Sequence, residues 1–577
     1  MMSHSIFRGT WVALVLAMNL VAAHWVQSAE VDSSAHVQSA PASSDPVLPH
    51  VAPHRGWSFK ELGLTPTLSG GRLKPFDSFA RETVLFETGS RKFESWEPLD
   101  LLFSWIAFPT YWETRTWIKI SRDDVKRQLG LDESRMTFSP DELLKNSILA
   151  QYAEQMERKE PGSMPPGAEK NNPREQELRN VLDKISLFHG LVTGRSWLLI
   201  PKVSAEGWGN LLEHAPDAVP IQKSFIQLLK AYQSGDQTEF EGVSKQLRQQ
   251  VQSAAPGFDS STQSKMEAEH LYQQFRPFLY AWVFYLIAAI AWVFSTVLKN
   301  STSLKASVAL GYTASVIAFV SHSVGFGLRC FIAGRPPVTN MYESVIWVSL
   351  GVMVFAWILY GIQRNKTLLS VASFLACFGL VAGDAAPAIL DPSINPLVPV
   401  LRSNYWLTVH VLTITLGYAA FALTFGLANV ALFQIARRAA KQKILAVNQL
   451  TYRSMQFGVV FIAAGTILGG VWADYSWGRF WGWDPKEVWA LITLLCYLVI
   501  LHGRYTNWMG PFGFAVGSAV SFMSVVMAWY GVNFILGAGL HSYGFSTGGT
   551  PWVLGFVVAE LVYVAATALV HRRSTAE

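Results

Sequence analysis

The segment from Val471 to Trp489 is unusually rich in tryptophan. Five tryptophans fall within 18 residues, namely Trp472, Trp477, Trp481, Trp483 and Trp489. Indole rings favour the headgroup level of a membrane, so an interfacial aromatic belt is the simpler interpretation. Gly478 and Gly482 interrupt the run, however, and this pattern favours a short aromatic platform on tightly turning backbone. A platform of this kind suits a large, flat, apolar ligand with one exposed edge.

A helix start follows the platform directly. Asp484 suits an N-cap, with Pro485 at the first helical position and Glu487 at the third. We therefore expect the next membrane span to begin at this point.

Histidines are the second group able to do chemistry here. Between residue 300 and the last predicted span they are His322, His410, His502 and His541. A histidine within or beside the membrane is a functional hypothesis by default. His410 and His541 are predicted at the outer face, where both can approach the tryptophans. Two neutral imidazoles on opposite sides of a porphyrin make a six-coordinate haem; the alternative is that both are satisfied polar groups near an interface.

His502 must act elsewhere. It follows Trp489 by 13 residues on one predicted helix, so it lies roughly 20 Å deeper. It cannot share a haem iron with His410 and His541. His322 lies in a predicted span and is either a packed, hydrogen-bonded residue or a group on a haem path.

Membrane helices must position these residues. Half of the chain is hydrophobic, 15% is charged, and apolar runs of about 20 residues recur from about residue 278. The sequence thus predicts a mainly α, polytopic membrane protein. The nine predicted spans are 278–298, 306–328, 342–361, 367–386, 406–433, 456–473, 487–504, 512–533 and 551–570.

The chain before these spans is expected to lie outside the membrane. Residues 1–29 are interpreted as a signal peptide or N-terminal anchor, and 30–275 as an external domain that begins with a flexible leader. Helical spacing predicts a mainly helical domain with some strand. The predicted helical stretches are Asp141–Arg158, Arg174–His189 and Ser224–Gln252, and a loop is predicted at Lys159–Pro173. The membrane domain is placed at 276–573, with a tryptophan-rich outer loop at 472–489.

Charge and cysteine content narrow the function. A net charge of +5 is too small and too scattered along the chain to suggest nucleic acid as a partner, and none is expected. Basic residues concentrate in the loops predicted to be cytoplasmic, which places the C-terminus inside. The cysteines, Cys330, Cys377 and Cys496, form no CxxC pair, which excludes a thioredoxin-like motif and a cysteine zinc site.

Taken together, the run WAxxxWGxxWGWDPKEVWA resembles the tryptophan-rich (WWD) signature of the haem-handling family of cytochrome c biogenesis. Within that family it looks like the CcsA (ResC) branch of the system II (CcsBA) cytochrome c synthase. The resemblance covers about residues 275–571. Two further stretches are similar to outer loops of the family: RCFIAGRPPVTNMYES at 329–344 and NFILGAGLHSYG at 533–544.

This resemblance implies haem b as substrate and bound ligand. It implies that His410 and His541 hold the iron of an external haem, gripped by the signature residues Trp472, Trp477, Trp481, Trp483, Asp484 and Trp489. It implies that His502 holds an intramembrane haem whose other ligand comes from a CcsB (ResB) membrane partner. The expected function is to present haem for thioether attachment to CxxCH apocytochromes, as a subunit of holocytochrome c synthase. Haem transport or chaperoning without ligation, and a scaffold that binds no haem, are the alternatives.

A shorter stretch links the external domain to the same family. GRLKPFDSFARE at 71–82 is similar to the external part of fused CcsBA proteins, but the chain lacks the several spans of a full CcsB half. A separate partner chain and a thiol-reducing protein for the apocytochrome are therefore expected, in addition to membrane lipid. The expected location is the bacterial cytoplasmic membrane, with 30–275 in the periplasm. Candidate cations for the haem propionates are Arg329, Arg335, Arg402 and Arg479.

Overall fold

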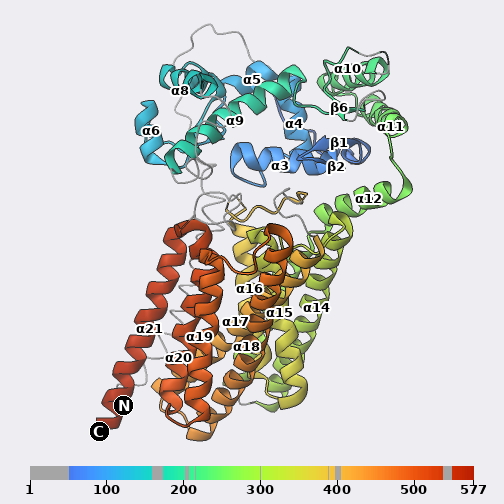
Figure 1. Ribbon diagram of the computed structural model, residues 1–577. Coiled ribbons are helices and arrows are strands. Elements are labelled where there is room, and N and C mark those ends of the chain that lie inside the picture. The colour runs from blue at the N-terminus through green and yellow to red at the C-terminus, as the bar shows by residue number, and fades with distance from the viewer. Residues whose placement is uncertain are drawn as a thin grey trace, which may run out of the picture.

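A set of long apolar helices and a smaller helical domain on one end of it make up the molecule (Figure 1). The computed structural model describes residues 51–158, 173–201, 207–214, 216, 218–298, 300–387, 389–396, 404–536 and 549–576. The predicted signal or anchor at 1–29, Arg402 and His541 lie outside the described residues. We call the end of the helices that carries the smaller domain the domain-side end.

The domain before the membrane helices, which we call the external domain after its predicted location, is mainly helical with three short antiparallel strand pairs, in agreement with the predicted helices and some strand. Its helices are α2 (Lys60–Gly63), α3 (Phe76–Thr88), α4 (Pro98–Ala107), α5 (Pro109–Thr114), α6 (Asp123–Leu129), α7 (Pro140–Leu144), α8 (Ser147–Arg158), α9 (Pro173–Thr193), α10 (Ala218–Ser234), α11 (Gln237–Ala254) and α12 (Ser260–Phe275). The antiparallel pairs are β1 (Pro66–Ser69) with β2 (Arg72–Pro75), β3 (Ile118–Lys119) with β4 (Thr137–Phe138), and β5 (Ile200–Pro201) with β6 (Trp208–Gly209).

Aromatic side chains fill the core of this domain. Trp105 and Trp117 stack with ring centroids 4.6 Å apart, and Phe188 packs against both rings. The stretch predicted to be helical, Ser224–Gln252, lies within two helices, α10 and α11. Gly235 adopts a left-handed conformation with φ of 76°, and Asp236 caps α11 by accepting a hydrogen bond from the Glu239 amide.

Nine helices of the described chain are long and apolar enough to cross a membrane, which confirms the predicted number. They contain α13 (Pro277–Val297), α14 (Ser301–Ala333), α15 (Met341–Gln363), α16 (Thr367–Ala385), α17 (Asn404–Ala436), α18 (Lys441–Trp477), α19 (Pro485–Tyr505), α20 (Pro511–Val526) with its continuation η2 (Met527–Leu536), and α21 (Thr550–Ala576). The chain passes from α12 to α13 through Arg276, whose φ of 47° breaks the helix.

The β1–β2 hairpin docks the external domain on the membrane helices. Gly70 and Gly71 both have positive φ, as a two-residue hairpin turn requires, and they bring the turn against Asn395 and Pro396. Arg72 follows the turn and donates two hydrogen bonds of 2.7 Å to the Glu269 carboxylate. It also donates to the Ile394 carbonyl at 2.6 Å. One guanidinium therefore joins the hairpin, α12 and the loop that precedes α17.

One further ion pair holds α12 to α3 within the domain, and a second joins the domain to the membrane helices. Asp77 on α3 lies 3.3 Å from His270 on α12. Burial raises the pKa of the Asp77 carboxyl, but hydrogen bonds from His270 and Arg81 outweigh burial and hold it below its ordinary value. Arg91 also reaches Asp384, at the end of α16, at 2.6 Å. The external domain is thus held at several points along its lower face.

Replacing Arg72 with methionine leaves the Glu269 side chain, only 3% exposed, without its cation. We expect the contact between the hairpin and α12 to lose about 3–5 kcal/mol, because an uncompensated charge then stays buried. Hydrogen exchange followed by mass spectrometry measures the loss as faster exchange in residues 66–75 and 389–396.

The matched control is Arg127→Gln, which breaks an ion pair with Glu133 between side chains that are 63% and 46% exposed. This surface pair is expected to contribute less than about 1 kcal/mol. Equal exchange in the two variants would show that Arg72 does not hold the hairpin.

Candidate functional site

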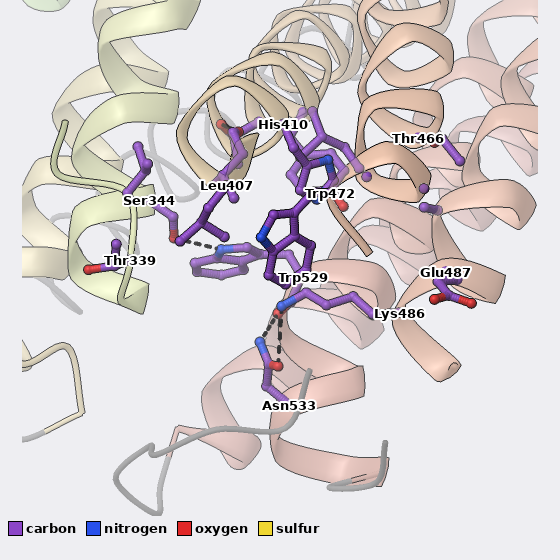
Figure 2. Close-up of a pocket in the computed structure, with 18 of the residues that line it drawn as sticks. Thr339, Ser344, Leu407, His410, Thr466, Trp472, Lys486, Glu487, Trp529 and Asn533 are labelled. Atoms are coloured by element: carbon purple, nitrogen blue, oxygen red, sulfur yellow. Dashed lines mark hydrogen bonds between the residues drawn. The ribbon is translucent and has the colours of Figure 1, made fainter. Parts of the chain in front are cut away.

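A pocket lies at the domain-side end of the membrane helices, between α15, α17, α18, α19 and η2 (Figure 2). Its cavity volume is about 120 Å³. Its walls are aromatic and aliphatic with a few polar groups, the composition expected of a small-molecule site. The lining residues used below are Met341, Ser344, His410, Gly469, Trp472, Trp481, Lys486, Glu487, Trp529 and Asn533.

His410, near the start of α17, has a fixed tautomer. Its Nδ1 lies 2.8 Å from the Gly465 carbonyl oxygen, which can only accept, so Nδ1 carries the proton and Nε2 the lone pair. Glycines on α18 make room for the ring, since a Cβ on Gly469 would lie 2.6 Å from Cε1 of His410. A neutral imidazole oriented by a carbonyl in this way is a typical ligand for a metal.

Trp472 packs parallel to His410, with ring centroids 6.1 Å apart and an interplanar angle of 6°. Its side chain is fully buried, and Trp477 meets it edge-on at 4.6 Å. Trp481 lines the pocket from the following loop. Three of the five predicted tryptophans therefore form or support one wall of the pocket.

The other two tryptophans lie elsewhere. Trp483 does not line the pocket; its side chain is 71% exposed, and its backbone has a φ of 56°. Trp489 lies on α19 and packs with the buried cluster that includes Phe421 and Tyr497.

The tryptophan segment is not one loop. The predicted outer loop at 472–489 is confined to residues 478–484, because α18 continues to Trp477 and α19 begins at Pro485. No residue from Trp472 to Trp477 breaks a helix. Gly478 is the first that can, and it ends α18 with a φ of 72° while its amide donates to the Asp474 carbonyl.

The predicted helix start at Asp484 is confirmed. The Asp484 side chain accepts from the Lys486 amide at 3.0 Å, and the Glu487 side chain accepts from the Asp484 amide at 3.1 Å. Glu487 also accepts from the Gly482 amide and pairs with Arg479 at 3.2 Å. This capping box fixes the Trp481–Trp483 loop onto α19, so the observed role of Asp484 is to position the loop.

Sequence reasoning missed the opposite wall of the pocket. Trp529 donates its indole N–H to Ser344 Oγ at 2.9 Å, and Asn533 donates to the Trp529 carbonyl (Figure 2). Both residues belong to the π-helix η2, a rare geometry that is frequent at functional sites. Asn533 opens the stretch 533–544 that the sequence singled out, whereas no sequence pattern marked Trp529.

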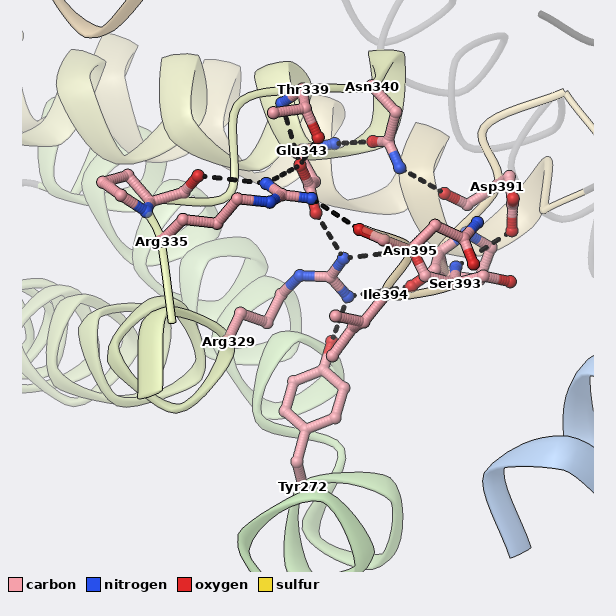
Figure 3. Close-up of polar contacts among 12 residues, drawn as sticks. Tyr272, Arg329, Arg335, Thr339, Asn340, Glu343, Asp391, Ser393, Ile394 and Asn395 are labelled. Atoms are coloured by element: carbon pink, nitrogen blue, oxygen red, sulfur yellow. Dashed lines mark hydrogen bonds and ion pairs between the residues drawn. The ribbon is translucent and has the colours of Figure 1, made fainter. Parts of the chain in front are cut away.

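One edge of the pocket, residues 338–344, is held by a buried carboxylate. Glu343 accepts from Arg329 at 2.9 Å and from Arg335 at 3.4 Å, and it also accepts from the amide and hydroxyl of Thr339 (Figure 3). The side chains of Glu343 and Arg329 are both 0% exposed. We call Arg329, Arg335, Thr339 and Glu343 the Glu343 cluster.

The Glu343 cluster also binds the loop before α17. Arg329 donates to the Pro392 carbonyl at 2.8 Å, and Arg335 donates to the Asn395 carbonyl at 2.7 Å. Arg72 of the external domain binds the carbonyl between them, that of Ile394. Arg329, Arg335 and Arg479 are thus occupied by carboxylates, which removes three of the predicted propionate partners.

His502 and His322 lie away from the pocket. His502 is exposed near the far end of α19, where its Nδ1 donates to the Leu498 carbonyl at 2.7 Å. It borders an apolar groove of about 360 Å³ with Leu495, Val499 and Trp508. His322 is fully buried and donates from Nε2 to the Ile346 carbonyl at 2.9 Å, which is the packed alternative of the two considered.

Comparison with known proteins identifies a cytochrome c assembly domain in the part of the chain that forms the pocket. The sequence model described as "Cytochrome C assembly protein" matches residues 338–541, which include every lining segment of the pocket. The chain is 32% identical over 265 residues to "Cytochrome c biogenesis protein CcsA" of Guillardia theta, covering 85% of that protein and 41% of this chain. It is also 32% identical over 253 residues to the CcsA protein of Prochlorococcus marinus, covering 79% of it.

A longer relative extends the similarity into the external domain. The chain is 27% identical over 494 residues to "Protein NrfI" of Wolinella succinogenes, and this match covers 82% of the chain. The chain spans 53% of the length of that protein.

The Glu343 cluster generates a prediction. Glu343→Gln removes the only negative charge in the cluster, so we expect a loss of about 3–5 kcal/mol, because the Arg329 guanidinium stays buried without its counter-ion. Thermal unfolding in detergent and hydrogen exchange in residues 338–344 measure the change. Glu267→Gln is the control, since Glu267 is 52% exposed and lies 3.9 Å from Arg248. If both variants melt at the same temperature, the cluster does not stabilise this edge.

Proposed function

Because the chain belongs to the CcsA family of cytochrome c biogenesis proteins, we propose that its pocket binds haem b and presents it to CxxCH apocytochromes. The observation that carries this proposal is the imidazole of His410, fixed with its lone pair on Nε2 beside a wall of tryptophan. A neutral axial histidine against aromatic walls suits a flat porphyrin whose iron needs a nitrogen ligand.

His541 supplies the second axial ligand in this proposal. It follows the end of η2 by five residues, and η2 itself lines the pocket through Trp529 and Asn533. The family resemblance assigns the same role to the position of His541. The short sequence distance between η2 and His541 supports this assignment.

Haem binding requires the pocket to widen. Its cavity of about 120 Å³ is smaller than the roughly 300–1,000 Å³ of typical ligand sites. The residues that would have to part are Trp481, on the short loop 478–484, and Trp472, on the last turns of α18.

In this proposal, the protein contributes to the reaction by positioning the haem against the cysteine thiols of the apocytochrome. Each thioether forms when a cysteine S–H adds across a haem vinyl group, so that sulfur bonds to one carbon and hydrogen to the other. His410 and the tryptophan wall would hold the porphyrin so that the vinyl edge faces the peptide, which lowers the entropic cost of the addition. The reduced thiols come from a separate thiol-reducing protein.

The external domain favours ligation over simple delivery. It is docked by Arg72 at the end of the membrane helices where the pocket lies. An unfolded apocytochrome or a CcsB (ResB) partner would meet this domain close to the haem.

His502 supports a second haem position at the opposite end of the helices. Its exposed imidazole beside an apolar groove leaves space for a partner chain to provide the other ligand. The alternative function is a haem transporter that delivers haem without forming the thioether.

The proposed location is the bacterial cytoplasmic membrane, with the external domain in the periplasm. Basic residues support this orientation, because Arg364, Lys366, Lys441 and Lys443 lie at the end of the helices away from the external domain.

The first test is the visible spectrum of the purified full chain, oxidised and reduced. His410→Ala and His541→Ala are each expected to lose the low-spin spectrum of a bis-histidine haem, because each removes one axial ligand. His502→Ala is expected to keep that spectrum, and His189→Ala, an exposed residue of the external domain, serves as control. Full haem occupancy in the double variant His410→Ala/His541→Ala would disprove the proposed site.

A subtler test moves the ring of His410 without removing it. The added Cβ of Gly469→Ala would lie 2.6 Å from Cε1 and 2.9 Å from Nδ1 of His410, so the imidazole must shift. We expect weaker haem binding and a change of spin state in the absorbance spectrum. Gly327→Ala is the matched control. Gly327 lies on another membrane helix, α14, and an added Cβ there would meet no atom within 4 Å. Identical spectra of the two variants would argue against a positioned axial ligand.

A further inference from the structure

Lys486 holds the positive charge of the pocket. Among the described lining residues, one is a lysine and one is a carboxylic acid, namely Lys486 and Glu487. The Glu487 carboxylate is already bound to Arg479 and to the amides of the capping box. Lys486 therefore lines the cavity without an ion pair to the neighbouring Glu487 carboxylate.

A neutral group is the hydrogen-bond acceptor for this ammonium. Lys486 Nζ lies 3.4 Å from Asn533 Oδ1, a long contact; among the described residues the Asp484 carboxylate acts on its charge without forming an ion pair with it. Asn533 is oriented for this contact because its Nδ2 donates to the Trp529 carbonyl at 2.8 Å. Figure 2 shows the lysine extending beneath Trp472 and Trp529 toward Asn533. A cation held between aromatic walls and a weak acceptor is suited to a stronger, anionic partner.

A buried carboxylate needs such a partner, since desolvation is costly unless the charge is paired. The arginines predicted for this role on the described chain are taken up by Glu343 and Glu487. Lys486 is also opposite the part of the wall formed by η2, and it reaches the cavity from the first turn of α19.

We infer that Lys486, assisted by Asn533, is the binding site for a carboxylate of the porphyrin substrate, a propionate. This inference rests on the proposed function and deepens it. With the carboxylate fixed at Lys486 and the iron at His410, the ring has a defined rotation within the pocket. The opposite edge, which carries the vinyl groups, is then the edge presented to the apocytochrome.

The test compares two probes, haem b and its dimethyl ester, in which both propionates are neutral. The full-length protein is titrated with each probe in dodecyl maltoside, a neutral detergent that supplies no competing phosphate. Lys486→Met is expected to weaken haem binding about tenfold, in the range of one charge-assisted contact. Binding of the dimethyl ester should be the same in wild type and Lys486→Met.

Two further variants control the charge. Lys486→Arg retains a cation and should restore most of the preference for haem over the ester. Lys443→Met removes an exposed lysine at the opposite end of the helices and should change neither affinity. Equal weakening of both probes in Lys486→Met would overturn the inference, because it would show that the lysine only packs against the ring. Unchanged haem affinity in that variant would overturn it too.

The two proposals fail in different ways. If wild-type protein binds neither probe, the proposed haem function fails and the inference fails with it. If wild type binds both probes with equal affinity, the haem function stands and the carboxylate site is disproved.

Discussion

The fold of the domain-side end depends on one buried carboxylate shared by two guanidinium groups. Glu343 sits in the first turn of α15, where the helix dipole favours a negative charge, and Arg329 and Arg335 approach it from the end of α14 and the loop beyond. Two cations on one carboxylate would be poorly balanced in an apolar setting. The excess positive charge is compensated by the backbone carbonyls of Pro392 and Asn395, and this need holds the loop before α17 against the cluster.

Two parts of the molecule far apart in sequence are joined by this arrangement. The loop that the Glu343 cluster holds also accepts a hydrogen bond from Arg72, so the external domain rests on backbone that the cluster has ordered. On the other side, Met341 and Ser344 of α15 line the pocket. Buried charge networks are weak evidence for net stability, and one use of them is to select a single arrangement. In this protein, the single arrangement selected by the Glu343 cluster would set the distance between the external domain and the pocket.

Sequence alone predicted the features that depend on local order. Long apolar runs predicted nine spans, and Asp484, Pro485 and Glu487 predicted a capped helix start, because both signals are contained within a few neighbouring residues. His410 was identified as a candidate by its type and place along a predicted span. The extent of the tryptophan loop was wrong, since the glycines suggested turns throughout and only Gly478 ends the helix. Trp529 and Lys486 could not be assigned to the pocket, because their positions depend on packing between helices distant in sequence, and the role of His541 stays a prediction.

The π-helix at Met527–Leu536 makes the pocket sensitive to the number of residues as well as to their identity. Its hydrogen bonds span five residues, so the chain turns less per residue than in an α-helix of the same length. Loss of one residue could let the segment return to α-helical pairing, and every later residue would then point in a new direction. Asn533 would leave Lys486, and the segment leading to His541 would start from a different face of the helix. An inserted or deleted residue in this segment is therefore expected to disturb the pocket more than a single conservative substitution does.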